Sequence, residues 1–277
     1  MNLFTLRFLF LIGSFGLLLG CTTSSGQRSC KVKTELHQSG NFEADLSIYS
    51  GEVESSKSII IFPPTGGTNL IDRSYAREFC TNGFDVIILN SWTGQNEKSI
   101  ELELHQRFYS RAQTALNLAL TKTKSSFVGL LGTSVGALHA SVAAATNERI
   151  KAVFAITGGV PIAEVVVLSD QKAMIDLKDA RKKQFNLKTD DEIIAEISKV
   201  FHLEPMLQGE LYRTKDLGVA IAAEDSTVPT DNQKKLVEFW KPKKIITLSN
   251  SHFWGIVNTW LFHTEEIIEF FQMSSNK

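Results

Sequence analysis

Ser134 has the surroundings of a nucleophile, because it lies in a Gly132-x-Ser134-x-Gly136 pattern between an apolar run and a stretch of small residues. The apolar run, 127–131, is typical of a buried strand, and the small residues after it predict a helix. On such a sharp strand-to-helix turn a serine projects its hydroxyl over the end of the sheet, while the glycines let neighbouring backbone come close. The pattern is short enough to arise by accident. It therefore predicts a nucleophile only together with a base, an acid and a matching fold.

A serine hydroxyl attacks a carbonyl only when a base accepts its proton. Of the 6 histidines, His252 alone follows the end of a late apolar strand. Because the carboxyl ends of parallel strands meet at one edge of a sheet, Ser134 and His252 can converge there. The other histidines fall in an edge hairpin, in helices or in a helical insertion, and they are His37, His105, His139, His202 and His263.

An acid is needed to orient the histidine, and two carboxylates compete for that role. Glu224 and Asp225 both come at the end of the apolar strand 217–223, and a Val-Pro pair then turns the chain into the next helix. Their position puts both at the edge of the sheet expected for the serine and the histidine. By residue type alone, either acid could instead cap a helix or lie on the surface.

Backbone N–H groups must also face the oxygen that becomes negative when the serine attacks a carbonyl. The amide of Val135 directly follows the serine and begins a helix, whose positive end adds to the stabilisation. A second amide is expected from the turn after an early β-branched strand. That turn opens with Pro63-Pro64, which have no N–H to offer, so Thr65 is the first possible donor and Gly66 is the next.

These residues need a sheet whose strands end along one edge, and the hydrophobic pattern predicts one. Residues 31–49 alternate in polarity, as expected of an edge hairpin. Beyond them, continuously apolar strands alternate with helices, which indicates βαβ units and a mostly parallel sheet with helices on both faces. Strands are predicted at 58–62, 84–89, 127–131, 152–156, 217–223 and 244–248, and helices at 71–80, 98–121, 135–145, 230–240 and 264–271.

An insertion interrupts this alternation at about 160–215. Its segments are mostly helical and rich in charge, and Thr189-x-x-Glu192 is a capping box that predicts the start of a helix. We interpret the insertion as a cap or lid over the active site. A set of ordinary connecting helices with no gating role is the alternative.

The serine pattern, the acid loop, His252 and the Pro-Thr-Gly-Gly turn together resemble the α/β-hydrolase superfamily over about 31–271. The chain order of serine, acid and histidine agrees with that superfamily. The resemblance favours Asp225 over Glu224, because Glu-Asp-x-x-Val-Pro is the form of its common acid loop. It implies an α/β-hydrolase fold with a helical cap and a Ser-His-Asp triad. In one departure, a Pro-Pro pair stands where that superfamily often has His-Gly.

The N-terminal segment resembles a bacterial lipoprotein signal. A positive charge precedes an apolar run, 8–19, that is too short for a comfortable membrane span, and Leu-Leu-Gly-Cys21 follows in the form of a lipobox. The resemblance implies that 1–20 are removed, that Cys21 carries the lipid, and that 21–30 form a tether to a hydrolase domain at 31–277. A plain cleaved signal or a single anchor helix is the alternative.

Such an anchor holds a protein at a bacterial envelope membrane through two or three acyl chains. Thr22 at the second position of the processed chain, in place of Asp, favours the outer over the inner membrane by the sorting rule of some Gram-negative lipoproteins. An oxidising envelope also permits a disulfide between Cys30 and Cys80. The alternative for Cys80 is a small buried hydrophobe beside Phe79 and Phe84.

The composition bounds the remaining classes of function. A chain of 277 residues with 43% hydrophobic residues and a formal net charge of -1 fits one α/β domain. This charge, without a Lys/Arg cluster among aromatics, does not favour nucleic-acid binding. The Cys/His spacings of zinc sites do not occur in the sequence, so neither a metal nor a cofactor is predicted.

The sequence therefore predicts a lipid-anchored serine hydrolase that acts on an ester or related acyl bond of a small-molecule or lipid substrate. A peptidase or amidase with the same triad is the second hypothesis, because the fold supports both reactions. A non-catalytic binding lipoprotein with a degenerate hydrolase fold is the third. The acyl group, the leaving group and the oligomeric state stay open.

Overall fold

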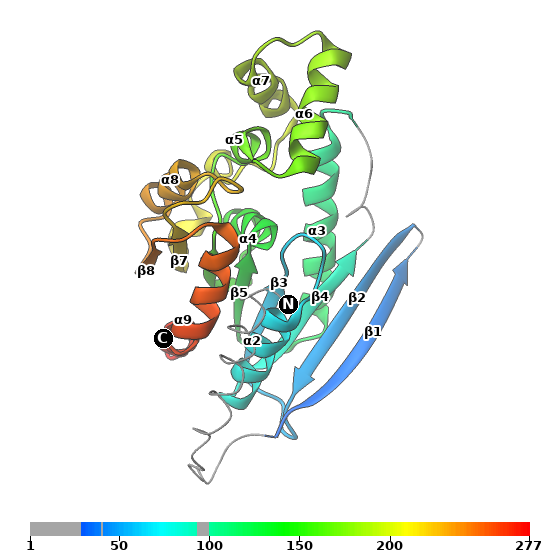
Figure 1. The fold of residues 1–277 in the computed structure, drawn as a ribbon. Coiled ribbons are helices and arrows are strands. Elements are labelled where there is room, and N and C mark those ends of the chain that lie inside the picture. The colour runs from blue at the N-terminus through cyan, green and yellow to red at the C-terminus, as the bar shows by residue number, and fades with distance from the viewer. Residues whose placement is uncertain (1–28, 40, 93–99) are drawn as a thin grey trace, which may run out of the picture.

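The computed structural model describes residues 29–39, 41–92 and 100–277, so the predicted signal, Cys21 and most of the tether lie outside the described residues. A sheet of eight strands runs through the molecule in the order β1-β2-β4-β3-β5-β6-β7-β8 (Figure 1). Its strands are β1 (Lys31–Ser39), β2 (Phe42–Ser50), β3 (Lys57–Phe62), β4 (Asp85–Trp92), β5 (Phe127–Thr133), β6 (Ile150–Ile156), β7 (Asp216–Ala222) and β8 (Lys244–Leu248).

The sheet is antiparallel at one edge and parallel elsewhere. β1 pairs with β2 and β2 pairs with β4 in antiparallel register, which makes the predicted edge hairpin. All the remaining neighbours, from β4 across β3 and β5 to β8, are parallel. Strands β3 to β8 therefore end along one edge, and the α/β fold class predicted from the hydrophobic pattern is confirmed.

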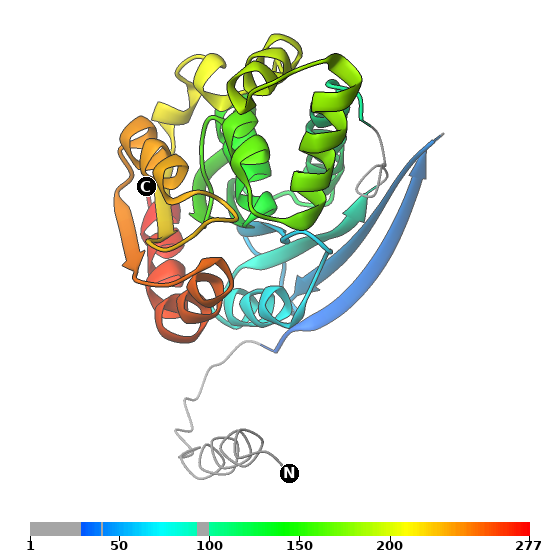
Figure 2. The same cartoon turned by 45° about the horizontal axis from the view of Figure 1, so that its top comes forward.

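Helices cover both faces of the sheet (Figures 1 and 2). α2 and α9 pack on one face in a hydrophobic cluster that includes Ile59 and Ile61 of β3. α3, α4 and α8 pack on the other face, where Ile60 and Phe62 of the same strand point. The continuous apolar run in β3 follows from this double cover. The helices of the two layers are α2 (Leu70–Thr81), α3 (Leu104–Thr121), α4 (Val135–Thr146), α8 (Thr230–Trp240) and α9 (His252–Ser275).

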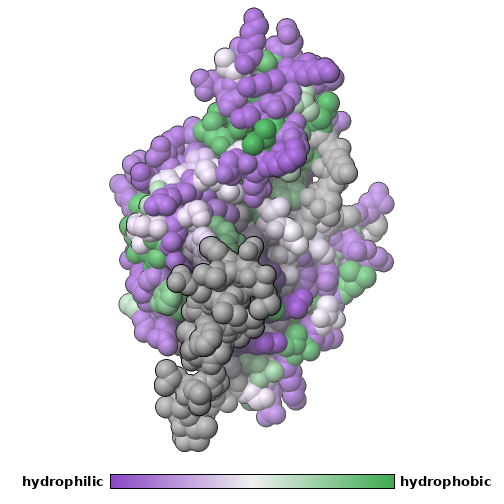
Figure 3. Space-filling view, in the orientation of Figure 1, coloured by the Kyte–Doolittle hydropathy of each residue, from purple (hydrophilic) through white to green (hydrophobic). Residues whose placement is uncertain are grey.

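A helical insertion, here called the cap, occupies the predicted position between β6 and β7. It consists of α5 (Ile162–Leu168), α6 (Lys172–Phe185), α7 (Asp190–Val200) and the short turns η2 (Pro205–Leu207) and η3 (Leu211–Thr214). The predicted capping box at the start of α7 is confirmed, because Thr189 and Glu192 exchange side-chain to backbone hydrogen bonds. The outer end of the cap, around α6 and α7, is mostly hydrophilic, and hydrophobic residues lie lower on it (Figure 3).

Buried contacts join the cap to the body. Ile193 and Ile197 of α7 pack in a cluster with Tyr109 of α3 and Val142 of α4. The buried Arg181 side chain of α6 reaches the segment before α3, where its guanidinium donates to the carbonyl oxygens of residues 100 and 101 and contacts the ring of the histidine at 105. Burial of such contacts orders the cap against the body.

Two helices begin elsewhere than the sequence pattern predicts. The helix predicted from 98 begins at Leu104, and residues 93–99 lie outside the described residues. The last helix, predicted from 264, begins at His252. Large hydrophobic residues lie on both the exposed and the buried sides of 252–263, so this stretch has little of the polar-apolar alternation on which the prediction depends.

A disulfide joins Cys30, just before β1, to Cys80 near the end of α2, with the two Cα atoms 6.1 Å apart. The bridge ties the start of the described domain to the face that α2 and α9 cover. Within the described residues, no helix combines the length and the apolar character that a membrane span requires.

Candidate active site

Ser134 lies on the sharp turn between β5 and α4, with the unusual backbone angles φ 56 and ψ -121. Its amide donates to the carbonyl of Ile156, which holds the turn against the end of β6. The two flanking glycines have a steric reason. A Cβ atom on Gly132 would lie 2.4 Å from the carbonyl oxygen of Gly136, and one on Gly136 would lie 2.1 Å from the carbonyl oxygen of Phe62. The turn can therefore form only with glycine at both positions.

His252 is the first residue of α9, and it follows β8 after a short turn that ends in the Ser251 N-cap. The Gly255 amide donates to the Ser251 carbonyl at 2.7 Å, so the first turn of the helix is closed. A Cβ atom on Gly255 would lie 2.7 Å from the Cβ atom of Ala222 at the end of β7. This close packing sets the imidazole over the edge of the sheet where β5 and β7 end.

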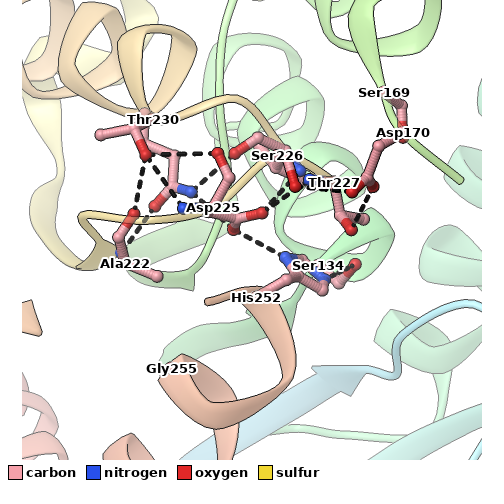
Figure 4. A network of polar contacts seen from close by, with 12 residues as sticks. Ser134, Ser169, Asp170, Ala222, Asp225, Ser226, Thr227, Thr230, His252 and Gly255 are labelled. Carbon is pink, nitrogen blue, oxygen red and sulfur yellow. Dashed lines mark hydrogen bonds and ion pairs between the residues drawn. The ribbon is translucent and has the colours of Figure 1, made fainter. Parts of the chain in front are cut away.

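Ser134, His252 and Asp225 form one chain of hydrogen bonds (Figure 4). The Nε2 atom of His252 lies 2.9 Å from the Oγ atom of Ser134, and its Nδ1 atom lies 2.7 Å from the Oδ2 atom of Asp225. An ionised carboxylate can only accept, so Nδ1 carries the hydrogen and the lone pair of Nε2 faces the serine hydroxyl. This tautomer is the one that a general base needs.

Four donors hold the Asp225 carboxylate, which is buried. Oδ1 accepts from the amides of Thr227 and Val228, at 2.9 and 3.0 Å. Oδ2 accepts from His252 and from Nε2 of Gln233, the latter at 2.7 Å. A buried carboxylate with all its oxygens hydrogen-bonded keeps a fixed orientation, so Asp225 can fix the imidazole in turn. Its competitor Glu224 is exposed at the surface.

A polar link connects the acid loop to the cap. Asp170, which follows α5, accepts from the hydroxyl groups of Ser226 at 2.5 Å and Thr227 at 2.8 Å (Figure 4). These two hydroxyls hold the pKa of the Asp170 carboxyl below its ordinary value. The link uses the two residues that follow Asp225 along the chain, so it holds the loop of Asp225 against the cap.

Sequence reasoning missed both Gln233 and Asp170. Gln233 lies inside α8, and nothing in its residue type distinguishes it from a surface glutamine. Asp170 lies 55 positions before Asp225 in the numbered sequence, so only the fold shows their proximity. The one signal for Gln233 is that a polar residue occupies a buried position of the helix. The sequence pattern of the helix alone does not show that this position is buried.

The candidate oxyanion donors lie on two segments that touch, the start of α4 and the turn after β3. Gly136, next to Val135, packs against the backbone of Phe62 and Pro63, so the start of α4 lies beside the end of β3. The first amides of a helix have no acceptor within the helix, which makes the Val135 amide available. Thr65 and Gly66 follow Pro63 in an exposed β-turn, in which the Gly67 amide donates to the Pro64 carbonyl. That Thr65 or Gly66 supplies the second donor stays a prediction.

The other histidines lie in different surroundings. His139 is buried inside α4 among the rings of Phe62, Trp92, Phe108 and Tyr109. Burial lowers the pKa of His139 to about 3, and burial beside Arg181 likewise lowers the pKa of His105 to about 3. Both rings are therefore neutral and structural at ordinary pH. His263 pairs with Glu266 further along α9.

The described residues contain no group of three or more histidine, cysteine or acidic side chains with the geometry of a metal site. Cys30 and Cys80, which the sequence leaves either bridged or separate, are joined by the disulfide described above. Cys21 lies outside the described residues.

Comparison with solved structures shows the fold of this chain. An acylaminoacyl peptidase of Pyrococcus horikoshii is similar with a TM-score of 0.66 and 16% identity over 88% of this chain, which spans only 42% of that peptidase. Est1E from Butyrivibrio proteoclasticus is similar with a TM-score of 0.66 and 13% identity, over 88% of this chain and 99% of its own. A cold-adapted esterase from an Arctic intertidal metagenomic library is similar with a TM-score of 0.61 and 11% identity, over 92% of this chain and 98% of that esterase.

These similarities, with the sheet order and the cap, define the chain as an α/β-hydrolase fold, as the sequence predicts. No protein-family model matches the sequence. A search of curated proteins found no match either. Since one fold supports several reactions, the activity has to be argued from the site itself.

Proposed function

We propose that this protein is a serine hydrolase that cleaves an ester or related acyl bond through Ser134, His252 and Asp225. The observation that carries the proposal is the continuous chain of hydrogen bonds from the Ser134 hydroxyl through both nitrogens of His252 to Asp225. The strained backbone at Ser134 supports it, because strain of this kind persists at sites where the surrounding structure holds a residue for function.

In the proposed reaction, the Ser134 Oγ atom bonds to the substrate carbonyl carbon as its proton passes to Nε2 of His252. The negative oxygen of the tetrahedral intermediate accepts from the Val135 amide and from Thr65 or Gly66. The C–O bond to the leaving alcohol then breaks, and the alcohol takes the proton from Nε2. Water then attacks the acyl-serine while its proton passes to Nε2 of His252. The bond from the acyl carbon to Ser134 Oγ breaks, Oγ takes the proton back from Nε2, and the acid is released.

An amide or peptide substrate is the second candidate. The specific observation in its favour is the similarity to the Pyrococcus horikoshii acylaminoacyl peptidase, although that similarity covers less than half of the peptidase chain. Two similar structures that this chain spans almost completely are Est1E and a cold-adapted esterase, which favours the ester.

We also propose that Cys21 carries a lipid that holds the domain at a bacterial envelope membrane, the outer membrane in preference to the inner. The lipobox-like sequence and the disulfide support this proposal together. The first is the form of a lipoprotein signal, and the second is typical of an oxidising compartment such as the bacterial envelope. Metabolic labelling with an alkyne palmitate tests it. The wild type should be labelled and Cys21→Ala should not, and equal labelling of the two would contradict the assignment.

A fluorophosphonate probe tests the nucleophile. It should label the wild type and leave Ser134→Ala unlabelled. Ser141→Ala is the matched control, because Ser141 is a second buried serine, two turns along α4, whose hydroxyl donates to the Ala137 carbonyl within the helix. Labelling of Ser134→Ala at the level of the wild type would contradict the assignment, and an unlabelled wild type would favour a non-catalytic binding protein.

A substrate panel tests the reaction class. p-Nitrophenyl esters of increasing chain length should be hydrolysed faster than aminopeptide p-nitroanilides at equal concentration. Faster cleavage of the anilides would favour the peptidase. In either case His252→Ala should lower kcat by several powers of ten, since removal of the base leaves only binding and the oxyanion site.

A further inference from the structure

The first three turns of α9 expose large hydrophobic side chains. Phe253, Trp254, Leu261 and Phe262, here called the α9 stripe, are between 53% and 72% exposed. At about 100° per residue these four positions fall within one half of the helix circumference. The rings of Phe253 and Trp254 contact each other at 5.3 Å in an edge-to-face arrangement. The opposite side of the same turns carries the buried Ile256 and Thr259.

The stripe begins directly beside His252. Phe253 follows His252 directly, at the edge of the sheet where the triad lies. The neighbouring helix α2 begins at this edge too, after the turn at Thr65, and its first residue, Leu70, is exposed. The two helices pack side by side, with the rings of Phe79 and Phe271 5.4 Å apart. Exposed hydrophobic side chains thus lie where two adjacent helices meet the catalytic edge.

The tether is attached where a bilayer that holds the proposed anchor can reach this surface. The disulfide fixes Cys30 to Cys80, beside Phe79 and therefore beside α9. Cys21 precedes Cys30 by nine residues, which span at most about 30 Å when fully extended. Trp254 precedes Phe271 by 17 residues, which corresponds to about 25 Å along a helix. A bilayer that holds Cys21 is therefore within reach of the stripe.

We infer that the α9 stripe docks on the surface of a lipid bilayer and turns the edge of the sheet that carries Ser134 and His252 toward it. Tryptophan and phenylalanine on one side of a helix suit the boundary between headgroups and acyl chains. Exposed Glu265 and Glu269 follow the stripe, so we expect docking by hydrophobic burial with little dependence on salt. The inference uses the anchor and the reaction proposed above for its geometry and its purpose. The docking itself is measured by tryptophan quenching, which does not require hydrolysis.

Quenching by brominated lipids tests the docking on the full chain. The protein is reconstituted into phosphatidylcholine vesicles with or without bromine in the acyl chains, and tryptophan fluorescence is recorded. Bromine should quench the wild type, and Trp254→Phe should lose most of that quenching because it removes the reporter. The double variant Phe253→Ser/Phe262→Ser retains Trp254 and should lose at least half of the quenching. Equal quenching of this variant and the wild type would overturn the inference.

Two controls keep the result specific. Leu36→Ser removes a hydrophobic side chain that is 62% exposed on the edge strand β1, and it should leave the quenching unchanged. Circular dichroism should show that each variant is folded. If the double variant instead converts a dimer into a monomer in sedimentation and is quenched like the wild type, the stripe is an interface between copies and the inference is wrong.

The same measurement in Ser134→Ala separates docking from catalysis. Bromine should quench Ser134→Ala like the wild type. A wild type that is quenched by bromine but is not labelled by the fluorophosphonate would support docking and contradict the proposed reaction. A protein that hydrolyses soluble esters but is not quenched would overturn docking and leave the proposed reaction intact.

Discussion

The Nε2 atom of Gln233 lies 2.7 Å from the same Oδ2 atom of Asp225 that faces Nδ1 of His252. Gln233 is buried in α8, where it also donates to the Val228 carbonyl and accepts from the Ala222 amide. One side chain thus joins the end of β7, the acid loop and the acid itself. We propose that Gln233 is a positioning residue for the proposed triad, because it holds the carboxylate that in turn holds the imidazole.

Gln233→Met should lower kcat about tenfold and leave KM almost unchanged, because a hydrogen bond to a charged group contributes about 1.5 kcal/mol and Asp225 would lose one of its four donors. Lys234→Met, at an exposed position of the same helix, is the control and should have no effect. Steady-state kinetics on a short p-nitrophenyl ester measures both. A rise in KM with an unchanged kcat would assign Gln233 to substrate binding instead.

The glycines of the elbow should tolerate no side chain. Gly136→Ala would force a Cβ atom to 2.1 Å from the Phe62 carbonyl oxygen, a backbone atom that cannot move aside, so the free energy of unfolding should fall by more than about 3 kcal/mol. Gly209→Ala is the control. It has positive φ but nothing within 4 Å, and should cost about 1 kcal/mol. Urea denaturation compares the two, and equal losses would contradict the steric explanation.

Much of the fold could be predicted because local pattern and long-range packing agree. α8 and β8 have the predicted bounds, and the rule that parallel strands end at one edge was sufficient to pair Ser134 with His252. The start of α9 could not be predicted, since exposed Phe253 and Trp254 conceal the polar side of the helix. Asp170 contacts Thr227, which is distant in the sequence, and Gln233 contacts Asp225 from inside a helix, and residue type carries no sign of either partner.

Stability should depend on pH through Glu204. Burial raises the pKa of this carboxyl to about 7, and Oε2 accepts from the Ile162 amide at the start of α5. The folded protein then binds more protons than the unfolded chain between pH 4.5 and 7. The stability that neutral Glu204 contributes is complete below pH 4.5 and is lost as the pH rises through 7.

Glu204→Gln removes this titration, so the variant should match the wild type at pH 5 and exceed its free energy of unfolding by about 2–3 kcal/mol at pH 8. Urea denaturation at the two pH values is the measurement. The difference in free energy of unfolding, wild type minus variant, should be lower at pH 8 than at pH 5. A higher difference at pH 8 would contradict the sign of the Glu204 pKa shift. Burial likewise raises the pKa of Asp72 to about 6, and the comparison with the variant cancels that contribution.

Reduction should destabilise the domain through the Cys30–Cys80 bridge. The bridge closes a segment with a sequence separation of 50, and the entropy of a loop of that size corresponds to about 3–4 kcal/mol. Thermal unfolding with and without dithiothreitol should show a lower Tm for the reduced wild type. Cys30→Ser/Cys80→Ala should already have the lower Tm and should not respond to reductant. An equal response of both proteins would assign the effect of reductant to something else.

The second oxyanion donor can be identified by a substitution that removes one hydrogen. Thr65 is the second residue of the turn that the Gly67–Pro64 hydrogen bond closes, and Gly66 has φ 98, which together describe a type II turn. Proline is favoured at the second position of such a turn, so Thr65→Pro should preserve the backbone while deleting the amide proton. If Thr65 donates to the oxyanion, kcat should fall about 100-fold or more.

Thr65→Ala is the matched control, because it removes the side chain and retains the amide, and it should leave kcat within about twofold of the wild type. An unchanged Tm for Thr65→Pro would show that the turn is intact. A kcat of Thr65→Pro close to that of Thr65→Ala would exclude the Thr65 amide and favour Gly66, whose N–H lies one residue further along the same turn. The result therefore decides between the two donors that the Pro63-Pro64 sequence leaves available.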